Sequence, residues 1–500
     1  MYVLAIDQGT TGTKVVAYRK DQKPAYIANR EFPQYFPRPG WVEHDAEEIW
    51  EVTLEGVREV LEGGSIRPSE IAAVGITNQR ETSVIWDRET GKPARKAIVW
   101  QCRRSADICR ELKEKGYQDL FCRRTGLVLD PYFSGTKLSW VMEHEPDIAH
   151  RAEAGDLAFG TVDSWLLYRM TGGRCHATDV SNASRTLLFN IHDLSWDADL
   201  AGVLGVPPSM LPEVRDSSGI FGITDPASFL GIEAPVAGIA GDQQAALFGQ
   251  ACFQTGMTKN TYGTGSFVLM NIGEKPILSG KGLLTTVAWG IGGRVTYALE
   301  GSIFVTGAAI NWLRDGLGII QEAREIEPLA RSVERSEGVF FVPAFVGLGA
   351  PYWDPSARAL MIGMTRGTGR GHVARAVIES MALQTADVIE LMAEETGIPI
   401  KELRVDGGAS VMDLLLEYQA DLLGVPVIRP VVKETTSLGA ALLAGLAVGF
   451  WKNLDEIAST WEAERRAEPR PGRHHEMEEL RRGWKKAVQR CLGWLEEGDR

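Results

Sequence analysis

The chain has 500 residues, of which 44% are hydrophobic and 24% charged, and it is long enough for two or more globular domains. Its net charge of -13 argues against DNA or RNA as a partner, because that affinity depends on clustered Lys and Arg. The six cysteines include no CxxC pair, so we expect reduced thiols and a cytoplasmic protein. We expect no signal peptide, because the N-terminus has no basic region and its apolar run stops at Asp7. We expect no membrane insertion, because the longest apolar run (438–451) is short and rich in glycine.

The chain opens with two apolar strands joined by a turn of glycine and threonine, since residues 3–18 read VLAIDQGTTGTKVVAY. Glycine lets backbone N–H groups approach an anion and threonine adds hydroxyl donors, so this turn is a candidate phosphate site. The spacing does not fit a P-loop, because Lys14 is followed by a strand rather than a helix. An ordinary glycine-rich hairpin turn is the alternative.

Helix and strand patterns then alternate along the chain. Residues 45–48 form a capping box ahead of apolar residues at helical spacing, and residues 71–77 read as a strand. A polar tip follows, in which Arg80 and Glu81 offer donors and acceptors side by side, before a second strand ends at Trp86. The alternative for this tip is a solvated ion pair, which contributes little. The alternation predicts an α/β architecture.

A weak internal sequence repeat suggests that the chain consists of two similar halves. Residues 260–270 again place a Gly-Thr-Gly turn before an apolar strand, roughly half the chain away from the opening hairpin. We therefore predict duplicated domains, 1–249 and 250–500, with a ligand cleft between them. Coincidence is the alternative, because Gly-Thr turns are common.

Two more segments place polar groups at strand ends. Asp242 follows small residues and precedes a helix pattern, and residues 403–409 form a strand that ends in Gly-Gly before a helix. An aspartate at a helix start is usually an N-cap. Asp7 and Asp242 both lie at strand-to-turn junctions, and two such carboxylates can instead share a Mg²⁺ ion and a phosphate group.

The chain resembles the FGGY family of carbohydrate kinases, within the actin/hexokinase/Hsp70-type nucleotide-binding fold. Segments 7–11, 241–244, 262–265 and 406–408 follow the order of that fold, and segments 132–140 and 363–379 match the two family signatures. Segments 39–44, 75–82, 99–104 and 347–354 match the family members that phosphorylate glycerol. The resemblance covers about residues 3–484 and implies two duplicated RNase H-like domains flanking a catalytic cleft.

The resemblance implies phosphorylation of glycerol to sn-glycerol 3-phosphate with ATP and Mg²⁺, and Asp242 as the general base. In the implied glycerol site, the residues are Arg80, Glu81, Tyr132, Asp242 and Gln243, with Trp100 and Phe267 as aromatic walls. In the implied ATP site, the residues are Thr10, Thr11, Gly12, Lys14, Thr264, Gly307, Asn311, Gly408 and Met412. Asp7 and Asp242 would face the metal.

Met412 departs from the family pattern, because many relatives have an asparagine there that contacts the base. Selectivity for the nucleotide is therefore expected to be looser. The alternatives are another FGGY kinase that acts on a pentulose or a tetritol, and a non-enzymatic nucleotide-driven protein on the same fold. The resemblance also implies a homodimer or homotetramer.

Overall fold

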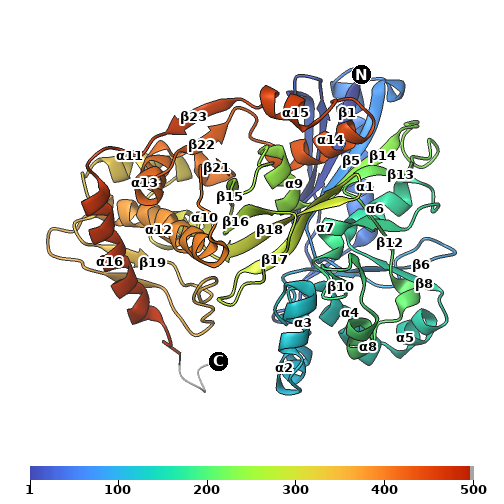
Figure 1. The fold of residues 1–500 in the computed structure, drawn as a ribbon, viewed down its shortest axis with the longest axis horizontal. Coiled ribbons are helices and arrows are strands. Elements are labelled where there is room, and N and C mark those ends of the chain that lie inside the picture. Colours follow the sequence, from blue (N-terminus) through green and yellow to red (C-terminus); the bar gives the residue numbers. More distant parts are fainter. Residues whose placement is uncertain (496–500) are drawn as a thin grey trace.

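The computed structural model describes residues 1–495 and consists of two lobes that share one sheet of thirteen strands (Figure 1). The N-terminal half contributes β1 (Tyr2–Gln8), β2 (Gly12–Tyr18), β3 (Pro24–Glu31), β5 (Ile71–Asn78), β13 (Ser218–Ile223) and β14 (Pro235–Gly241). The C-terminal half contributes β15 (Thr258–Tyr262), β16 (Ser266–Gly273), β17 (Leu284–Ile291), β18 (Arg294–Ile303), β21 (Leu403–Asp406), β22 (Val427–Pro430) and β23 (Ala463–Ala467).

Helices cover both faces of this sheet. The longer ones are α1 (Ala46–Gly63), α6 (Val162–Met170), α9 (Asp242–Gly249), α12 (Arg370–Thr396), α13 (Asp413–Leu423), α14 (Thr435–Ala447) and α16 (His474–Cys491). A mainly helical insertion in the first half contains α2 (Ala106–Glu114), α3 (Gln118–Thr125), α4 (Ser134–His144), α5 (Pro146–Glu153) and α8 (Ala198–Leu204). The insertion has an apolar core of its own, separate from those of the two lobes.

The two halves repeat one strand pattern. In the first, β3, β2 and β1 are antiparallel neighbours, and β5 and β14 continue the sheet in parallel with β1. In the second, β18, β16 and β15 are antiparallel neighbours, and β21 and β22 continue in parallel with β15. The hairpins β1–β2 and β15–β16 thus occupy equivalent positions, which confirms the duplicated fold and excludes coincidence as the source of the repeat.

The sheets of the two lobes meet at a narrow junction. Strand β13 pairs with β17 through the single residue pair Ser218 and Ile291. Helix α14 lies beside this junction, and although it belongs to the C-terminal half, it packs on β5, β14 and β1 of the first lobe. The predicted division of the chain at residue 249 stays a prediction. Helix α14 lies after that residue in sequence but packs on the strands of the first lobe.

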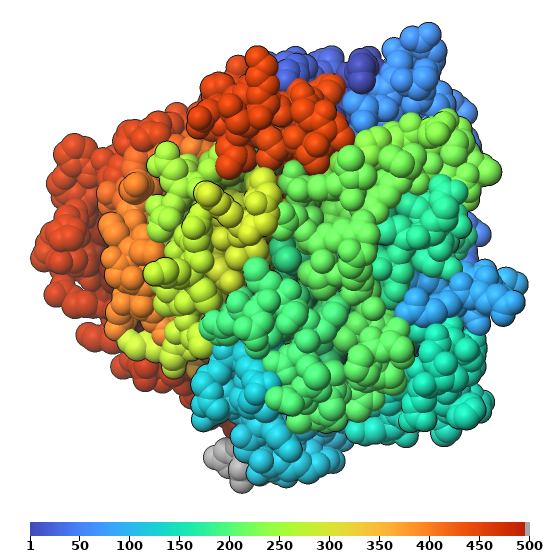
Figure 2. All heavy atoms as spheres, turned by 45° about the vertical axis from the view of Figure 1, so that its right-hand side comes forward, coloured from blue at the N-terminus to red at the C-terminus, as the bar shows by residue number. Residues whose placement is uncertain are grey.

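The chain after α14 also returns to the first lobe. Trp451 donates its indole N–H to the carbonyl oxygen of Lys20, at 3.0 Å, and Lys20 pairs with Glu456 of α15 (Leu454–Thr460). In Figure 2 this orange segment lies against the blue N-terminal strands at the top of the molecule. No helix within residues 1–495 is long and apolar enough to cross a membrane.

Local predictions from the sequence hold with small shifts. The side chain of Asp45 caps α1, since it accepts a hydrogen bond of 3.0 Å from the N–H of Glu47. The other half of the predicted capping box does not form, because the Glu48 carboxylate accepts instead from the hydroxyl of Tyr35 at 2.6 Å. The predicted strand 71–77 is β5, and the apolar run 438–451 contains most of the buried helix α14. Asp242 is not an N-cap, because it is the first residue of α9 and Gly241 occupies the cap position.

Helices α9 and α14 touch backbone to backbone. A Cβ atom at Gly439 of α14 would lie 1.8 Å from the carbonyl oxygen of Ala245, and one at Gly249 of α9 would lie 2.0 Å from that of Thr435. Only glycine permits this approach, which brings both helices against β14, the strand that ends just before Asp242.

We predict that Gly439→Ala lowers the free energy of unfolding by about 3 kcal/mol, because the new methyl group must push the two helices apart. Gly202→Ala in α8 is the matched control, since a Cβ there would meet nothing within 4 Å. The control should be neutral or more stable by about 0.5–1 kcal/mol in urea denaturation. Equal stability of both variants would contradict the close helix crossing.

Candidate active site

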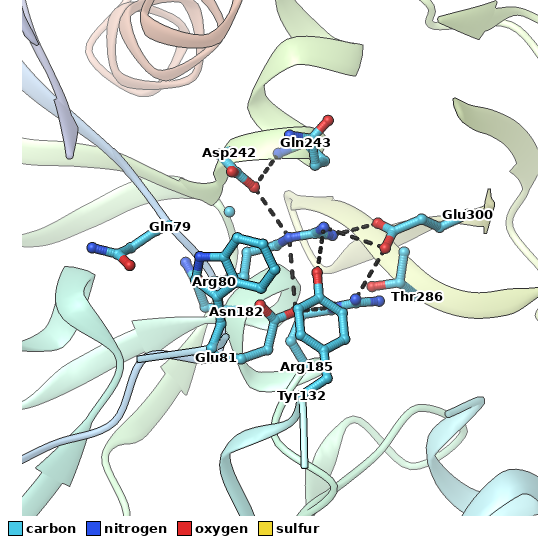
Figure 3. A network of polar contacts seen from close by, with 12 residues as sticks. Gln79, Arg80, Glu81, Tyr132, Asn182, Arg185, Asp242, Gln243, Thr286 and Glu300 are labelled. Atoms are coloured by element: carbon cyan, nitrogen blue, oxygen red, sulfur yellow. Dashed lines mark hydrogen bonds and ion pairs between the residues drawn. The ribbon is translucent and has the colours of Figure 1, made fainter. Parts of the chain in front are cut away.

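Arg80 is the centre of the site and lies just beyond the end of β5 (Figure 3). Its side chain is 2% exposed, and its Nε lies 3.1 Å from Oδ1 of Asp242. Its two amino groups pair with the carboxylate of Glu300, and Nη2 donates to the hydroxyl of Tyr132 at 3.4 Å. The guanidinium carbon lies 5.7 Å from the centre of the Phe267 ring. All three nitrogens are thereby held in one orientation.

Glu81 belongs to the same network through a second arginine. Its carboxylate accepts a hydrogen bond of 2.7 Å from Nε of Arg185, whose Nη2 donates to Glu300 at 3.0 Å. Glu81 has a backbone φ of +63°, an uncommon value for a residue with a side chain. The side chains of Arg80, Glu81, Arg185 and Glu300 are each at most 2% exposed. The alternative of a solvated ion pair at this tip is therefore wrong.

The charges of the network balance one another. Burial opposes ionisation of Glu300, but Arg185 and Arg80 outweigh it and lower the pKa of that carboxyl to about 2. Burial raises the pKa of Glu81, although the same two arginines oppose the shift. Glu300 is therefore charged at neutral pH, and it holds both arginines.

Asp242 stands where this network opens to solvent. Its side chain is 31% exposed, and Oδ1 accepts a hydrogen bond of 2.7 Å from the N–H of Gln243. Gly241 lets Arg80 approach, since a Cβ there would lie 2.7 Å from the arginine Cδ. The carboxylate is thus anchored at one oxygen and accessible to a ligand.

The opening hairpin lies beside the site. Trp100 donates its indole N–H to Oγ1 of Thr10 at 2.9 Å, and its ring meets the Tyr132 ring edge-on at 5.5 Å. Trp100 therefore links the hairpin to the predicted glycerol pocket as well as lining it. Thr11 is exposed at the tip, and Gly12 has no room for a side chain, because a Cβ would lie 2.7 Å from the carbonyl oxygen of Arg30.

Two charged residues of the hairpin strands face a helix of the other half. Lys14 forms an ion pair with Glu434, the residue before α14. Burial raises the pKa of Asp7 to about 7, with Lys14 opposing the shift and Asp242 and Glu434 adding to it. The charge of Asp242 thus acts on the carboxyl of Asp7, which agrees with the prediction that both face one metal ion.

The donor set fits Mg²⁺ bound jointly with phosphates. Mg²⁺ is usually held in kinases by one or two carboxylates together with substrate oxygens. Within residues 1–495 no group of three or more His, Cys, Asp or Glu side chains could hold a metal ion alone. Asp7 and Asp242 thus suit an ion that arrives with a nucleotide.

The predicted nucleotide residues of the second half gather around the β15–β16 turn. The N–H of Gly307 donates to the carbonyl oxygen of Gly263 at 3.0 Å, which joins this turn to α10 (Gly307–Asn311). Thr264, Asn311 and Gly408 are exposed. Met412 is 5% exposed and belongs to the core of the second lobe, so its side chain is withdrawn from the surface where a base would lie.

Sequence reasoning missed Arg185, Glu300 and Lys259, all of which are fully buried. Arg185 lies 104 residues from Glu81 in the chain, and Glu300 lies 220 residues from Arg80. No local motif marks them, because each acts through a partner that only the tertiary fold brings near. A charged residue inside a largely apolar stretch of strand was the available signal for Glu300, whereas Lys259 lies among the polar residues of β15 and carried no such signal.

We predict that Glu300→Gln lowers the free energy of unfolding by about 3–5 kcal/mol, because it leaves two buried arginines without their shared carboxylate. Glu111→Gln is the matched control, since Glu111 pairs with Lys115 while both side chains are more than 60% exposed. The control should change stability by less than about 1 kcal/mol. Denaturant titration of both variants measures the difference, and similar values would contradict the central role of Glu300.

Two family models match the chain: the N-terminal domain of the FGGY family of carbohydrate kinases over residues 2–249, and its C-terminal domain over residues 258–448. The chain is 59% identical to "Glycerol kinase 2" of Thermotoga maritima and 56% identical to "Glycerol kinase" of Geobacillus sp., with 99% of each chain covered. Among solved structures, it is similar to Plasmodium falciparum glycerol kinase with ADP, at 35% identity, TM-score 0.93 and 98% coverage of both chains.

A gluconate kinase from Lactobacillus acidophilus has the same fold, with a TM-score of 0.87 at 21% identity, 98% of this chain and 99% of that chain being covered. Both halves of the chain thus match their family models, and relatives that cover the full length share more than half of its residues. The predicted resemblance is confirmed, and the chain belongs to the FGGY family of carbohydrate kinases.

Proposed function

We propose that the protein transfers the γ-phosphoryl group of ATP to glycerol and forms sn-glycerol 3-phosphate and ADP. The observation that carries this proposal is the rigid Arg80–Glu81 pair beside the accessible carboxylate of Asp242. The names of the full-length relatives support the same reaction and the same substrate.

Asp242 is the general base in this proposal. A primary alcohol is a weak nucleophile, so a carboxylate within hydrogen-bond reach is the expected proton acceptor. The hydroxyl oxygen forms a bond to the γ-phosphorus, the bond to the bridging oxygen of ADP breaks, and the hydroxyl proton passes to Asp242. The hydrogen bond from the N–H of Gln243 keeps one carboxylate oxygen in place for this step.

The remaining pocket groups suit a small polyol. Arg80 offers donors and Glu81 offers acceptors at fixed positions, because the buried network holds both. Trp100, Tyr132 and Phe267 supply aromatic surface for the carbon chain. Polar groups placed for every hydroxyl reject analogues that leave them unpaired.

The hairpin and the second-lobe turn would hold the nucleotide. Thr10, Thr11, Gly12 and Lys14 would contact the β- and γ-phosphates, which requires Lys14 to leave Glu434. Thr264, Gly307, Asn311 and Gly408 would contact the remainder of the nucleotide. Mg²⁺, held by Asp7 and Asp242, would neutralise charge on the phosphates. Because Met412 is buried, its side chain would not contact the base, which would lie against neighbouring residues. We therefore still predict that the site selects loosely among nucleotide bases.

The cellular location and the oligomeric state of the protein stay predictions. A cytoplasmic protein fits the six cysteines, none of which forms a disulfide. The homodimer or homotetramer is likewise a proposal, which size-exclusion chromatography with light scattering tests.

A coupled assay for ADP tests the reaction itself. We expect turnover with glycerol and much less with xylulose, ribulose, erythritol or gluconate under the same conditions. Preference for one of these would identify another kinase of the family. ATP hydrolysis without any acceptor preference would favour a nucleotide-driven protein of the same fold.

We predict that Asp242→Asn lowers kcat about 10²–10⁴-fold and changes the KM for glycerol little, because the base is lost while the pocket remains. Asp107→Asn is the control, since Asp107 forms an exposed pair with Arg110 on α2 and should leave both constants unchanged. A near-normal kcat for the first variant would exclude Asp242 as the base.

We predict that Asp7→Asn abolishes most of the activity but stabilises the ligand-free protein. The pKa of about 7 in the folded protein lies above the ordinary aspartate value of 3.8, so ionised Asp7 destabilises the fold increasingly from about pH 4 until the carboxyl is fully charged above pH 7. The Tm of the variant should therefore exceed that of the parent, by a margin that widens between pH 5 and pH 8. A margin independent of pH would contradict the shifted carboxyl.

A further inference from the structure

Lys259 is a fully buried cation that the mechanism above does not use. It lies on β15, and its fully buried side chain reaches Gln243 of α9. Within residues 1–495 no carboxylate forms an ion pair with it, and its Nζ donates instead to Oε1 of Gln243 and to Oγ1 of Thr261, the latter at 2.9 Å. An isolated buried ammonium is expensive, so its presence needs a reason.

The hydrogen-bond chemistry of lysine fixes how the Gln243 amide lies. A lysine ammonium has three donors and no acceptor, so it faces only the carbonyl oxygen of an amide. The NH₂ group of Gln243 must then face away from Lys259. Gln243 is 7% exposed, and its backbone N–H donates to Oδ1 of Asp242, the predicted base.

We propose that Lys259 is a positioning residue that holds Gln243 as a hydrogen-bond donor to an oxygen of the polyol. This inference rests on the proposed function. A hydroxyl group whose oxygen accepts from Gln243 turns its own proton elsewhere, and Asp242 is the neighbouring acceptor. Lys259 thus ensures that the polyol hydroxyl donates toward the base.

The electrostatic surroundings agree with a role in orientation. Burial lowers the pKa of Lys259 to about 8, while Asp406, Asp242 and Glu300 act to raise it and Arg80 to lower it. Two of these carboxylates have other partners: Asp406 accepts from Gln250 and Thr435, and Glu300 from the two arginines. The ammonium therefore remains available to the amide of Gln243.

A double-mutant cycle tests the proposal in the full-length protein. Lys259→Met removes the donor at similar length, and we expect it to raise the KM for glycerol about 3- to 10-fold, the range of one hydrogen bond. The KM for ATP should stay unchanged. In the background of Gln243→Ala, Lys259→Met should add nothing, because its effect passes through Gln243. Additive effects, or an unchanged KM for glycerol, would overturn the proposal.

Gln243→Glu separates orientation from folding. The new carboxylate gives Lys259 a better acceptor, so we expect a Tm equal to or above that of the parent, yet it removes the NH₂ donor and should raise the KM for glycerol about tenfold or more. An unchanged KM in this variant overturns the proposal even if Lys259→Met does not fold.

Asn260→Ala is the matched control on β15. Its side chain donates to Thr385 of α12, and Lys259 lies on the other face of the strand. The control should lower stability without raising the KM for glycerol, and a rise equal to that of Lys259→Met would reduce Lys259 to a structural role. A parent protein inactive with glycerol but active with another polyol would instead overturn the proposed function.

Discussion

The carboxylate of Glu300 is the contact on which the geometry of the site depends. It is supplied by a strand of the C-terminal half and holds two arginines of the N-terminal half. Arg80 in turn touches Asp242 and Tyr132, and Arg185 holds Glu81. The proposed substrate-binding groups are thus oriented by a residue of the opposite half, so their arrangement depends on the correct joining of the two lobes.

Close helix packing joins the two lobes beside this network. Helices α9 and α14 cross with backbone in contact, and α14 also packs on the strands that end at the hairpin and at Asp242. Glu434 at the start of α14 pairs with Lys14, so the same helix reaches the predicted phosphate site. A shift of α14 would therefore displace both the predicted phosphate site at Lys14 and the predicted base, Asp242.

The site also keeps groups that oppose folding. Asp7 is a carboxyl with a raised pKa, and Glu81 holds an uncommon backbone conformation. Lys259 is a buried ammonium that pairs with no carboxylate of residues 1–495. Such features are retained where the surrounding structure over-determines them, and they mark functional positions. Their concentration within one region is independent support for the location of the site.

The sequence alone determined the features that depend on neighbouring residues. The glycine-threonine hairpins, the capped helix after Asp45 and the order of the family motifs are local, and they were sufficient to predict the fold and the family. Tertiary structure decided the features that depend on distant residues. It buried the Arg80–Glu81 tip that looked like a surface ion pair, withdrew Met412 into the core and brought Arg185, Glu300 and Lys259 to the site. The physical reason is that a buried charge is specified by its partner, and the partners of Arg80 and Glu81 lie 220 and 104 residues away in the chain.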